Sequence, residues 1–338
     1  MSRRGKLLAV ALLGGALVLF VLAAVEINYL FLPAKIVGTT SFVIEPGDNA
    51  RDIADTLYGA GLIRSRLLFL IIARQKGLEA RLRAGEYTLE PGLTVEQIVQ
   101  RLEKGQVNPW SFTVPEGTTV MQIADILAEK GYAGRDEFLE AARDPDLVKE
   151  FLPAGSSLKE PLEGYLAPNT YKVRKGAPAE EFIKIMLDAT KSYYTQEFKQ
   201  RLDGVKLTFH EALTLASIVE REAALDSERP VIASVYFNRL HIGMKLDADP
   251  TVMYAIGRTT GDLALKDLEY DSPYNTYRVP GLPPGPIACP GLKSLEAVLS
   301  PSGDPYLYFV ANGDRSHLFS RTLAEHMQNI RRARSSSR

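Results

Sequence analysis

The sequence contains one cysteine, Cys289, so no disulfide bond can form within the chain. It has only four histidines and no HExxH or CxxC motif, which argues against a zinc site. Neither sign of charge is in excess, since forty Lys and Arg residues balance forty-one Asp and Glu residues. A nucleic-acid-binding protein normally carries a basic surplus. We therefore expect no metal ion, no other cofactor and no nucleic-acid partner.

Long apolar runs are also scarce, and the one that occurs lies at the N-terminus. It extends from Leu7 to Val25 and follows Arg3, Arg4 and Lys6. At about 1.5 Å per residue, such a helix nearly crosses a hydrocarbon core of about 30 Å. The basic flank predicts that residues 1–35 form a cytoplasmic N-terminus and a single-pass anchor, with the rest of the chain outside the cell membrane. The alternative is a cleaved signal peptide, whose apolar region is usually shorter.

A weak internal repeat follows this segment. The sequence SFVIEPG at 41–47 is echoed by SFTVPEG at 111–117, and a shorter copy, YTLEPG, stands at 87–92. Each copy reads as a short strand and a glycine turn, followed by a helix that a small polar side chain caps. The expected caps are Asn49, Thr94 and Thr119.

The first copy opens a strand–helix–helix–strand pattern. We expect a strand from Val43, helices over Ala50–Tyr58 and Ser65–Gln75, and a returning strand that begins at Gly85. This order resembles the LysM module, which binds glycans that contain N-acetylglucosamine. The pattern predicts a LysM-like glycan-binding domain over 36–108. A small α+β spacer would have the same pattern, and the sequence does not separate the two.

The remaining chain divides by composition. Residues 109–154 read as a linking strand–helix–helix segment, and residues 155–330 carry the clustered prolines, glycines and aromatic residues. Residues 331–338 are basic without an apolar period, which predicts a disordered tail. The strand–helix–helix–strand pattern over 36–108 is of the α+β class, which we expect for the folded part of the chain.

One helix carries the first candidate for chemistry. Thr208 and Glu211 fit a capping box, and the helix runs on to Ala224. On the helical wheel Glu220 falls on the apolar stripe, whereas Glu222 lies about 160° away and is expected to be solvated. A buried carboxylate must be paired, protonated or functional. The wheel alone favours a buried ion pair, for which Arg239 is a candidate partner.

Two other segments have compositions that suit chemistry. Asp247-Ala-Asp249 is a DxD sequence of the kind that holds a metal in some glycosyltransferases, but no nucleotide-binding glycine loop accompanies it. Tyr274-Asn-Thr-Tyr277 precedes Gly281-Leu-Pro-Pro-Gly285, a stiff aromatic loop whose rings and amides suit a sugar. A structural turn would have the same composition. No G-x-S-x-G elbow of a serine hydrolase is present.

Several motifs occur in the order that is typical of one family. They are LEGYL at 162–166, ASIVERE at 216–222, NRL at 238–240, DPTV at 249–252, YNTY at 274–277, GLPPGPI at 281–287, PYLYFV at 305–310 and HLF at 317–319. On these motifs the chain resembles the endolytic murein transglycosylases, the YceG-like family, over nearly its whole length.

The resemblance implies that 155–330 is an α+β catalytic domain. It would cut nascent peptidoglycan between N-acetylmuramic acid and N-acetylglucosamine, leave 1,6-anhydro ends and so terminate glycan elongation. The partners would be glycan strands, the membrane and, as a further expectation, peptidoglycan synthases. The resemblance assigns Glu220 as the catalytic residue. Residues expected to bind substrate are Glu163, Asn238, Asp249, Thr251, Tyr274, Asn275 and Tyr277.

A single catalytic carboxyl suits a lytic mechanism, in which the muramic C6 hydroxyl attacks its own anomeric carbon. A hydrolase needs a second group to activate water or to form a glycosyl intermediate. Two alternatives stay open at this stage. One is a hydrolytic muramidase that pairs Glu220 with Asp249 or Glu163, and the other is a non-catalytic, peptidoglycan-binding scaffold.

Overall fold

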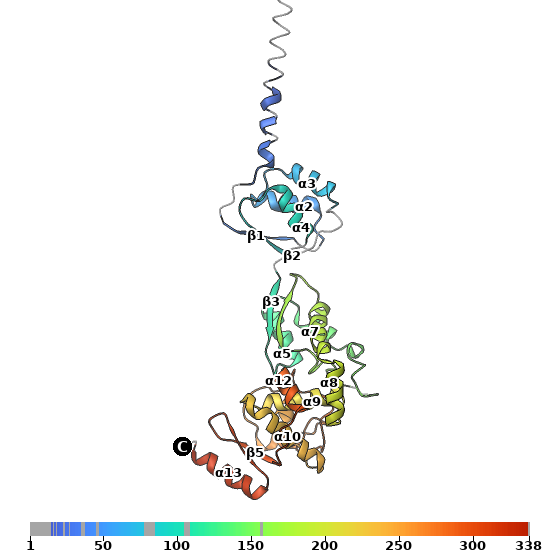
Figure 1. Cartoon of the computed structure of the whole chain (residues 1–338), viewed down its shortest axis with the longest axis vertical. Helices are drawn as coiled ribbons and strands as arrows, with labels where there is room; N and C mark the ends of the chain where they lie inside the picture. The colour runs from blue at the N-terminus through green and yellow to red at the C-terminus, as the bar shows by residue number, and fades with distance from the viewer. Residues whose placement is uncertain are drawn as a thin grey trace, which may run out of the picture. The chain divides into compact units, whose positions relative to one another are not determined.

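The computed structural model describes residues 15, 17, 19–22, 24–26, 28–34, 38–44, 47–77, 85–104, 109–155 and 158–336. The chain forms two compact units (Figure 1), which we treat separately. The first comprises residues 1–110 and 172–176, and the second comprises 111–171 and 177–338. Segment 109–154 thus falls almost entirely in the same unit as the motif-rich region that follows it.

The first unit contains a two-stranded antiparallel sheet and three helices. Strand β1 (Thr40–Ile44) pairs with β2 (Gly85–Leu89), and Phe42 lies opposite Tyr87. Between the strands come α2 (Ala50–Gly59) and α3 (Arg66–Gln75), and α4 (Val95–Glu103) follows. The predicted order of strand, helix, helix and strand is confirmed. This order does not identify the unit as a LysM module.

Local sequence explains where these helices begin. The side chains of Asn49, Ser65 and Thr94 accept hydrogen bonds from the first free backbone N–H groups of α2, α3 and α4. The apolar faces of the helices then meet on one core with the inward side chains of the sheet. Its fully buried members include Ile53, Leu57, Phe69, Tyr87, Ile98 and Leu102.

The predicted anchor falls largely outside the described residues. Of the run Leu7–Val25, residues 7–14, 16, 18 and 23 are not described, and the rest are helical and exposed. Within the part of the chain that the structure describes, no helix has the length and apolar content to cross a membrane. The anchor therefore stays a prediction.

The second unit is mainly helical. In chain order it contains β3 (Trp110–Val114), α5 (Val120–Glu129), α6 (Arg135–Ala141), β4 (Asn169–Val173), α7 (Ala179–Tyr193), α8 (Gln196–Val205), α9 (Phe209–Glu222), α10 (Arg229–His241), α11 (Asp249–Ala255), α12 (Leu292–Leu299), β5 (Tyr308–Ala311), β6 (His317–Ser320) and α13 (Leu323–Ser336). Strand β3 pairs with β4, and β5 pairs with β6 as an antiparallel hairpin. Together with the first unit, these elements confirm the α+β class.

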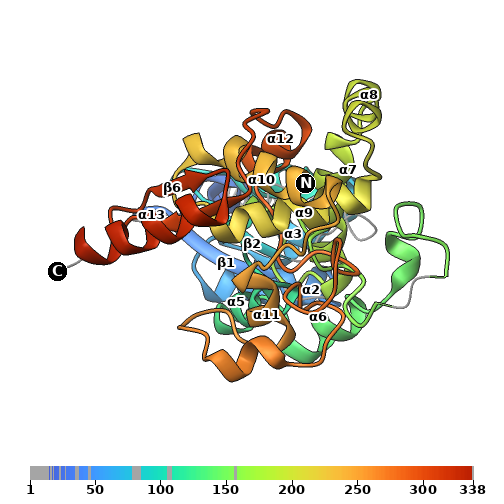
Figure 2. The same cartoon turned by 90° about the horizontal axis from the view of Figure 1, so that it is seen from below.

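Helix α9 forms the centre of the second unit. It packs against α10, α11 and α12, and α10 also packs on α12. Figure 2 shows α9, α10 and α12 as neighbouring ribbons. The capping box predicted at its start is present, because Thr208 and Glu211 each accept a hydrogen bond from the other's backbone N–H. All residues from Ala212 to Val219 are buried. The end of this helix, at Glu222, is thus held by packing on several sides.

The C-terminal segment differs from its prediction. Residues 331–336 continue helix α13 and do not form a disordered tail, while 337 and 338 lie outside the described residues. Helix α13 packs on both strands of the β5–β6 hairpin, and Ala333 is buried. Tertiary contact therefore outweighs the polar composition of this segment.

Candidate active site

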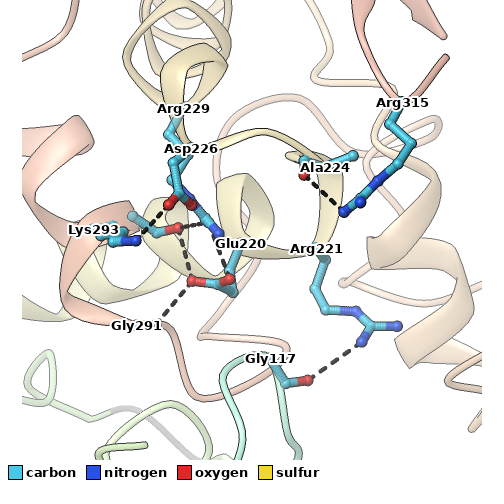
Figure 3. A network of polar contacts seen from close by, with 10 residues as sticks. Gly117, Glu220, Arg221, Ala224, Asp226, Arg229, Gly291, Lys293 and Arg315 are labelled. Atoms are coloured by element: carbon cyan, nitrogen blue, oxygen red, sulfur yellow. Dashed lines mark hydrogen bonds and ion pairs between the residues drawn. The ribbon is translucent and has the colours of Figure 1, made fainter.

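The end of α9 places Glu220 in a buried polar network (Figure 3). Its Oε1 lies 3.0 Å from Nη1 of Arg229, and the side chains of Glu220 and Arg229 are only 6% and 8% exposed. Its Oε2 accepts hydrogen bonds from the Gly291 N–H at 2.9 Å and from the Ser294 hydroxyl at 2.8 Å. Both oxygens of this carboxylate are therefore occupied by donors within the protein.

These donors give Glu220 a role in the fold. Gly291 is the N-cap of α12 and has no side chain to accept the free N–H groups of the first turn. The Glu220 carboxylate instead accepts the N–H of Gly291 itself and the hydroxyl of Ser294 in the first turn, and its negative charge suits the positive end of the helix. Arg229, at the start of α10, also bonds Asp226 at 3.0 Å. The network thus fastens three helices at one point.

The ion pair that the helical wheel favoured is present, but its partner is Arg229 and not Arg239. Arg239 instead donates hydrogen bonds to two backbone carbonyls, those of Leu246 and Leu307. Its guanidinium lies 5.5 Å from the centre of the Tyr308 ring. Arg239 was misassigned because a wheel gives direction from one helix and does not show which other element lies opposite.

Glu222 was expected to be solvated, and this expectation is wrong. The side chain is half-buried, and its Oε1 accepts a hydrogen bond of 3.0 Å from the hydroxyl of Tyr236, a residue of α10 with 1% exposure. Oε2 has no hydrogen-bond partner among the described residues. α10 covers the side of α9 that the wheel assigns to solvent, so Glu222 is partly shielded from water although it lies on a different face from Glu220.

Burial raises the pKa of Glu222 to about 7. The negative charge of Asp249 raises it further, whereas the Tyr236 hydrogen bond and the positive charges of Arg239 and Arg221 lower it. A carboxyl group with a pKa near neutrality can give up a proton and take one back at physiological pH, as a general acid/base must.

Glu222 lies on the wall of a cavity of about 490 Å³. The cavity's other lining side chains include Arg239, Asp247, Asp249, Tyr277, Tyr308, His317 and His326. The hydroxyl of Tyr277 donates a hydrogen bond of 2.6 Å to Asp249 Oδ1. Two residues that the sequence predicted to bind substrate, Asp249 and Tyr277, thus share this cavity with Glu222.

Asp247 also lines this cavity and adopts a left-handed backbone conformation, with φ of 45°. Such a conformation costs energy for a residue other than glycine, and it often accompanies function. Burial raises the pKa of its carboxyl group, while Arg239 and Lys245 lower it. Both carboxyls of the DxD sequence therefore lie on the same cavity as Glu222, a connection that the sequence did not predict.

The hairpin and α13 contribute two histidines to the same cavity. His317 is fixed on the wall by Glu228, which lies 2.7 Å from its Nδ1 and accepts its backbone N–H at 2.9 Å. The His326 ring stacks on Tyr308, and burial lowers its pKa. Its buried Nδ1 atom has no hydrogen-bond partner within the described residues.

Two more of the predicted substrate residues lie at a second cavity, of about 470 Å³. Glu163 is 3% exposed, and its carboxyl accepts the Val120 N–H at 3.1 Å and the Tyr254 hydroxyl at 3.4 Å. Burial raises its pKa to about 8. The ring of Tyr274 lies 5.0 Å from that of Tyr254. Glu163 and Tyr274 therefore do not line the cavity that contains Glu222.

The other three predicted substrate residues serve the fold. Thr251 and Asn275 have no exposed surface, which corrects the expectation that they contact sugar. Thr251 bonds Ala248 and Thr276, and the Asn275 amide donates to the carbonyls of Leu268 and Tyr270. The Asn238 amide donates to the carbonyls of Asp304 and Tyr306. These side chains shape the loops that carry Asp249, Tyr277 and Tyr308.

Two of the sequence motifs pack directly against each other. Gly164 of LEGYL has φ of 81°, and a Cβ atom there would lie 2.3 Å from Cβ of Pro286 in GLPPGPI. Only glycine fits such a contact. The two motifs are thus parts of one packed junction, although Gly164 and Pro286 are 122 positions apart in the chain.

Comparisons with known proteins agree on one family. The model of the YceG-like family matches residues 42–332. A Bacillus subtilis protein named endolytic murein transglycosylase is 37% identical over 300 residues, which cover 85% of this chain and 83% of that protein. A Streptococcus pneumoniae protein of the same name is 31% identical over 84% of this chain, which spans 58% of the longer pneumococcal protein. A crystal structure of a YceG-like protein from Listeria monocytogenes matches with a TM-score of 0.61 and 37% identity, covering 86% of this chain and 98% of that one.

Proposed function

This chain belongs to the YceG-like family, and from that membership we propose that it is an endolytic lytic transglycosylase of peptidoglycan. It cuts between N-acetylmuramic acid and N-acetylglucosamine within a strand, leaves 1,6-anhydro ends and thereby ends glycan elongation. The names of the relatives from Bacillus subtilis and Streptococcus pneumoniae support this reaction. The observation that carries it in the structure is a carboxyl group of near-neutral pKa on the wall of a polar cavity.

Glu222, and not Glu220, is the acid/base in this proposal. Glu220 has both oxygens bonded to Arg229, Gly291 and Ser294, so neither can approach a substrate without breaking the network at the start of α12. Glu222 lines the cavity, and Tyr236 holds one of its oxygens, while the other has no hydrogen-bond partner among the residues that the structure describes. A pKa of about 7 keeps a large fraction of its carboxyl protonated at neutral pH.

In the proposed reaction, Glu222 first donates a proton and then takes one back. Neutral Glu222 donates its proton to the glycosidic oxygen while the bond from that oxygen to the muramic C1 breaks. The muramic C6 hydroxyl forms a new bond to C1 and gives its proton to the Glu222 carboxylate. No water is consumed, and the carboxyl group returns to its starting state.

Nearby charges support this sequence of protonation. Asp249, held by the Tyr277 hydroxyl, raises the pKa of Glu222 and adds negative charge to the cavity, which favours an oxocarbenium-like transition state there. Arg239 opposes it and keeps the pKa of Glu222 from rising further. Tyr277 and Tyr308 offer ring faces of the kind that stack on sugars.

The carboxyl groups of the Glu222 cavity also suit a hydrolase. The sequence suggested a lone carboxyl, but Asp247 and Asp249 lie beside Glu222 and could activate water. Product analysis of purified glycan strands decides the matter by mass spectrometry. A transglycosylase leaves anhydro ends, which are about 18 Da lighter than the reducing ends of a hydrolase because no water is added. Reducing ends alone would refute the lytic reaction.

The finer parts of the proposal concern location. Residues 1–35 anchor the chain in the cell membrane with the catalytic unit outside, on the evidence of the apolar run Leu7–Val25 and its basic flank. The first unit holds glycan as a LysM-like module would, in keeping with its predicted element order. Synthases that extend the same strand are the expected partners. Fractionation of cells that express the full chain or residues 36–338 tests the anchor, since only the full chain should sediment with membranes.

A further inference from the structure

The cavity beside Glu163 has a composition that the cleavage reaction does not require. Basic side chains from separate segments line it: Arg135 and Arg143 at either end of α6, Lys159 before LEGYL, and Arg258 after α11. Two carboxyl groups, those of Glu160 and Glu163, line it as well, together with the phenols of Tyr254 and Tyr274. Charges of both signs thus surround a single pocket.

Two of these groups lack side-chain partners within the described part of the chain. The Oε2 atom of Glu160 is buried and has no hydrogen-bond partner among the residues that the structure describes. The exposed ammonium of Lys159 likewise has no ion-pair or hydrogen-bond partner there. Leaving a buried carboxylate oxygen unsatisfied is costly, so this position suits a ligand that brings a donor. An unpaired ammonium nearby suits a ligand that also brings a carboxylate.

Glu163 adds hydrogen-bonding capacity without charge at neutral pH. Burial raises its pKa to about 8, so its carboxyl is largely protonated in the folded protein. Together with the hydroxyls of Tyr254 and Tyr274 it can give and accept hydrogen bonds, as amide groups of a peptide require. The pocket is therefore suited to a short zwitterionic peptide rather than to a neutral sugar.

Two elements connect this pocket to the Glu222 cavity. Helix α11 carries Asp249, which lines the Glu222 cavity, and Tyr254, which lines the pocket beside Glu163. In the YNTY loop, likewise, Tyr277 lines the Glu222 cavity and Tyr274 lines the pocket. Tyr254 lies five positions after Asp249 on the helix, an axial rise of about 7.5 Å. An extended peptide of three or four residues spans about 10–14 Å, which is longer than this rise.

We propose that the pocket formed around Glu160, Lys159, Tyr254 and Tyr274 binds the stem peptide of the muramic acid whose glycosidic bond is cut beside Glu222. This rests on the proposed function and specifies its substrate as peptide-bearing strands. Glu160 receives an ammonium group of the stem's diamino acid, and Lys159 receives a carboxylate. The peptide thereby fixes the register of the strand in the Glu222 cavity.

The test compares two strands on the full-length protein: strands with intact stem peptides and strands from which an amidase has removed them. Wild type is expected to show a kcat/KM about tenfold or more higher for the peptide-bearing strand. Lys159→Met and Glu160→Gln should reduce that ratio toward one while leaving kcat/KM for the bare strand unchanged. Lys149→Met is the matched control, because its ammonium pairs with Asp146 on the surface and does not line the pocket; it should keep the wild-type ratio.

Equal kcat/KM for the two strands in wild type would overturn this proposal, and so would an unchanged ratio in both pocket variants. Either result would leave the proposed function intact, because anhydro ends would still form. Absence of anhydro ends from both strands would instead overturn the proposed function, and this proposal with it. Titration of free stem tetrapeptide into Glu222→Gln gives an independent readout, in which binding should weaken in the added presence of Glu160→Gln.

Discussion

The hydroxyl of Tyr236 donates a hydrogen bond of 3.0 Å to Oε1 of Glu222 and so fixes one half of that carboxyl group against α10. The other oxygen has no partner among the described residues, and the side chain lines the cavity that also contains Asp249. This hydrogen bond, and the oxygen beside it that has no partner in the described part of the chain, distinguish Glu222 from Glu220, the other glutamate of the sequence Glu220-Arg-Glu222. Glu222 keeps one oxygen available for chemistry, and Glu220 keeps none.

Replacing Tyr236 by Phe should move the pH dependence of cleavage. The Tyr236 hydrogen bond stabilises the Glu222 carboxylate and lowers its pKa, so its loss should raise the pKa above about 7. Because the protonated form starts the reaction, the alkaline limb of kcat/KM should shift to higher pH, by roughly one unit. A profile measured from pH 5 to 9 checks this, and a shift to lower pH would contradict it.

Replacing Asp249 by Asn should move the alkaline limb of the kcat/KM profile to lower pH. The Asp249 charge raises the pKa of Glu222, so its removal should lower that pKa and bring the alkaline limb to lower pH, by up to about one unit. Asp271→Asn serves as control, since the Asp271 carboxylate is 96% exposed and does not line the cavity. If both variants keep the wild-type profile, Asp249 does not act on Glu222.

The stability of the protein should fall as pH rises, and Glu163 should account for part of the fall. Its pKa is about 8 when folded and near 4.5 when unfolded. Between these values the folded state keeps a proton that the unfolded state has released, so the free energy of unfolding decreases as pH rises from about 4.5 to 8, by a few kcal/mol at most.

Glu163→Gln removes this dependence because glutamine does not titrate. Denaturant unfolding at pH 5 and pH 8 should therefore show a smaller loss of stability in the variant than in wild type. Glu222 continues to contribute between about pH 4.5 and 7, so some dependence remains. An identical loss in wild type and variant would mean that Glu163 titrates normally in the folded state.

Arg229→Met should destabilise the second unit strongly. It leaves the Glu220 carboxylate, 6% exposed, without its counter-charge, which costs about 3–5 kcal/mol for a buried pair. Lys149→Met breaks an ion pair whose members are 72% and 74% exposed, and it should cost no more than about 0.5 kcal/mol. Urea unfolding of both variants measures the difference in their stability. Equal midpoints would contradict the structural role of the Glu220–Arg229 ion pair.

Much of the fold could be predicted from local sequence. Asn49, Thr94, Thr119 and Thr208 all cap helices where the repeat and the capping box indicated, because an N-cap depends on residues within one turn. The C-terminal tail was mispredicted because α13 is stabilised by contact with the β5–β6 hairpin, which composition does not reveal.

The site was only partly predictable, for a related reason. The helical wheel correctly placed Glu220 on the buried side, yet it could not show that α12 begins opposite Glu220 or that Tyr236 covers Glu222. The motifs predicted Asp249 and Tyr277 as substrate-binding residues, and both line the Glu222 cavity. Their separation from Glu163 and Tyr274 depends on the position of α11 between two cavities, which is a property of the folded chain alone.

The most direct test of the central claim is a comparison of Glu222→Gln with Glu220→Gln on purified peptidoglycan strands, with circular dichroism to confirm that each variant is folded. Loss of the acid/base should lower kcat by about 10²- to 10⁴-fold in Glu222→Gln at undiminished stability. Glu220→Gln should lose stability but keep cleavage within about tenfold of wild type at temperatures where it is folded. Near-normal formation of anhydro ends by Glu222→Gln, together with a folded but inactive Glu220→Gln, would contradict the account and return the catalytic role to Glu220.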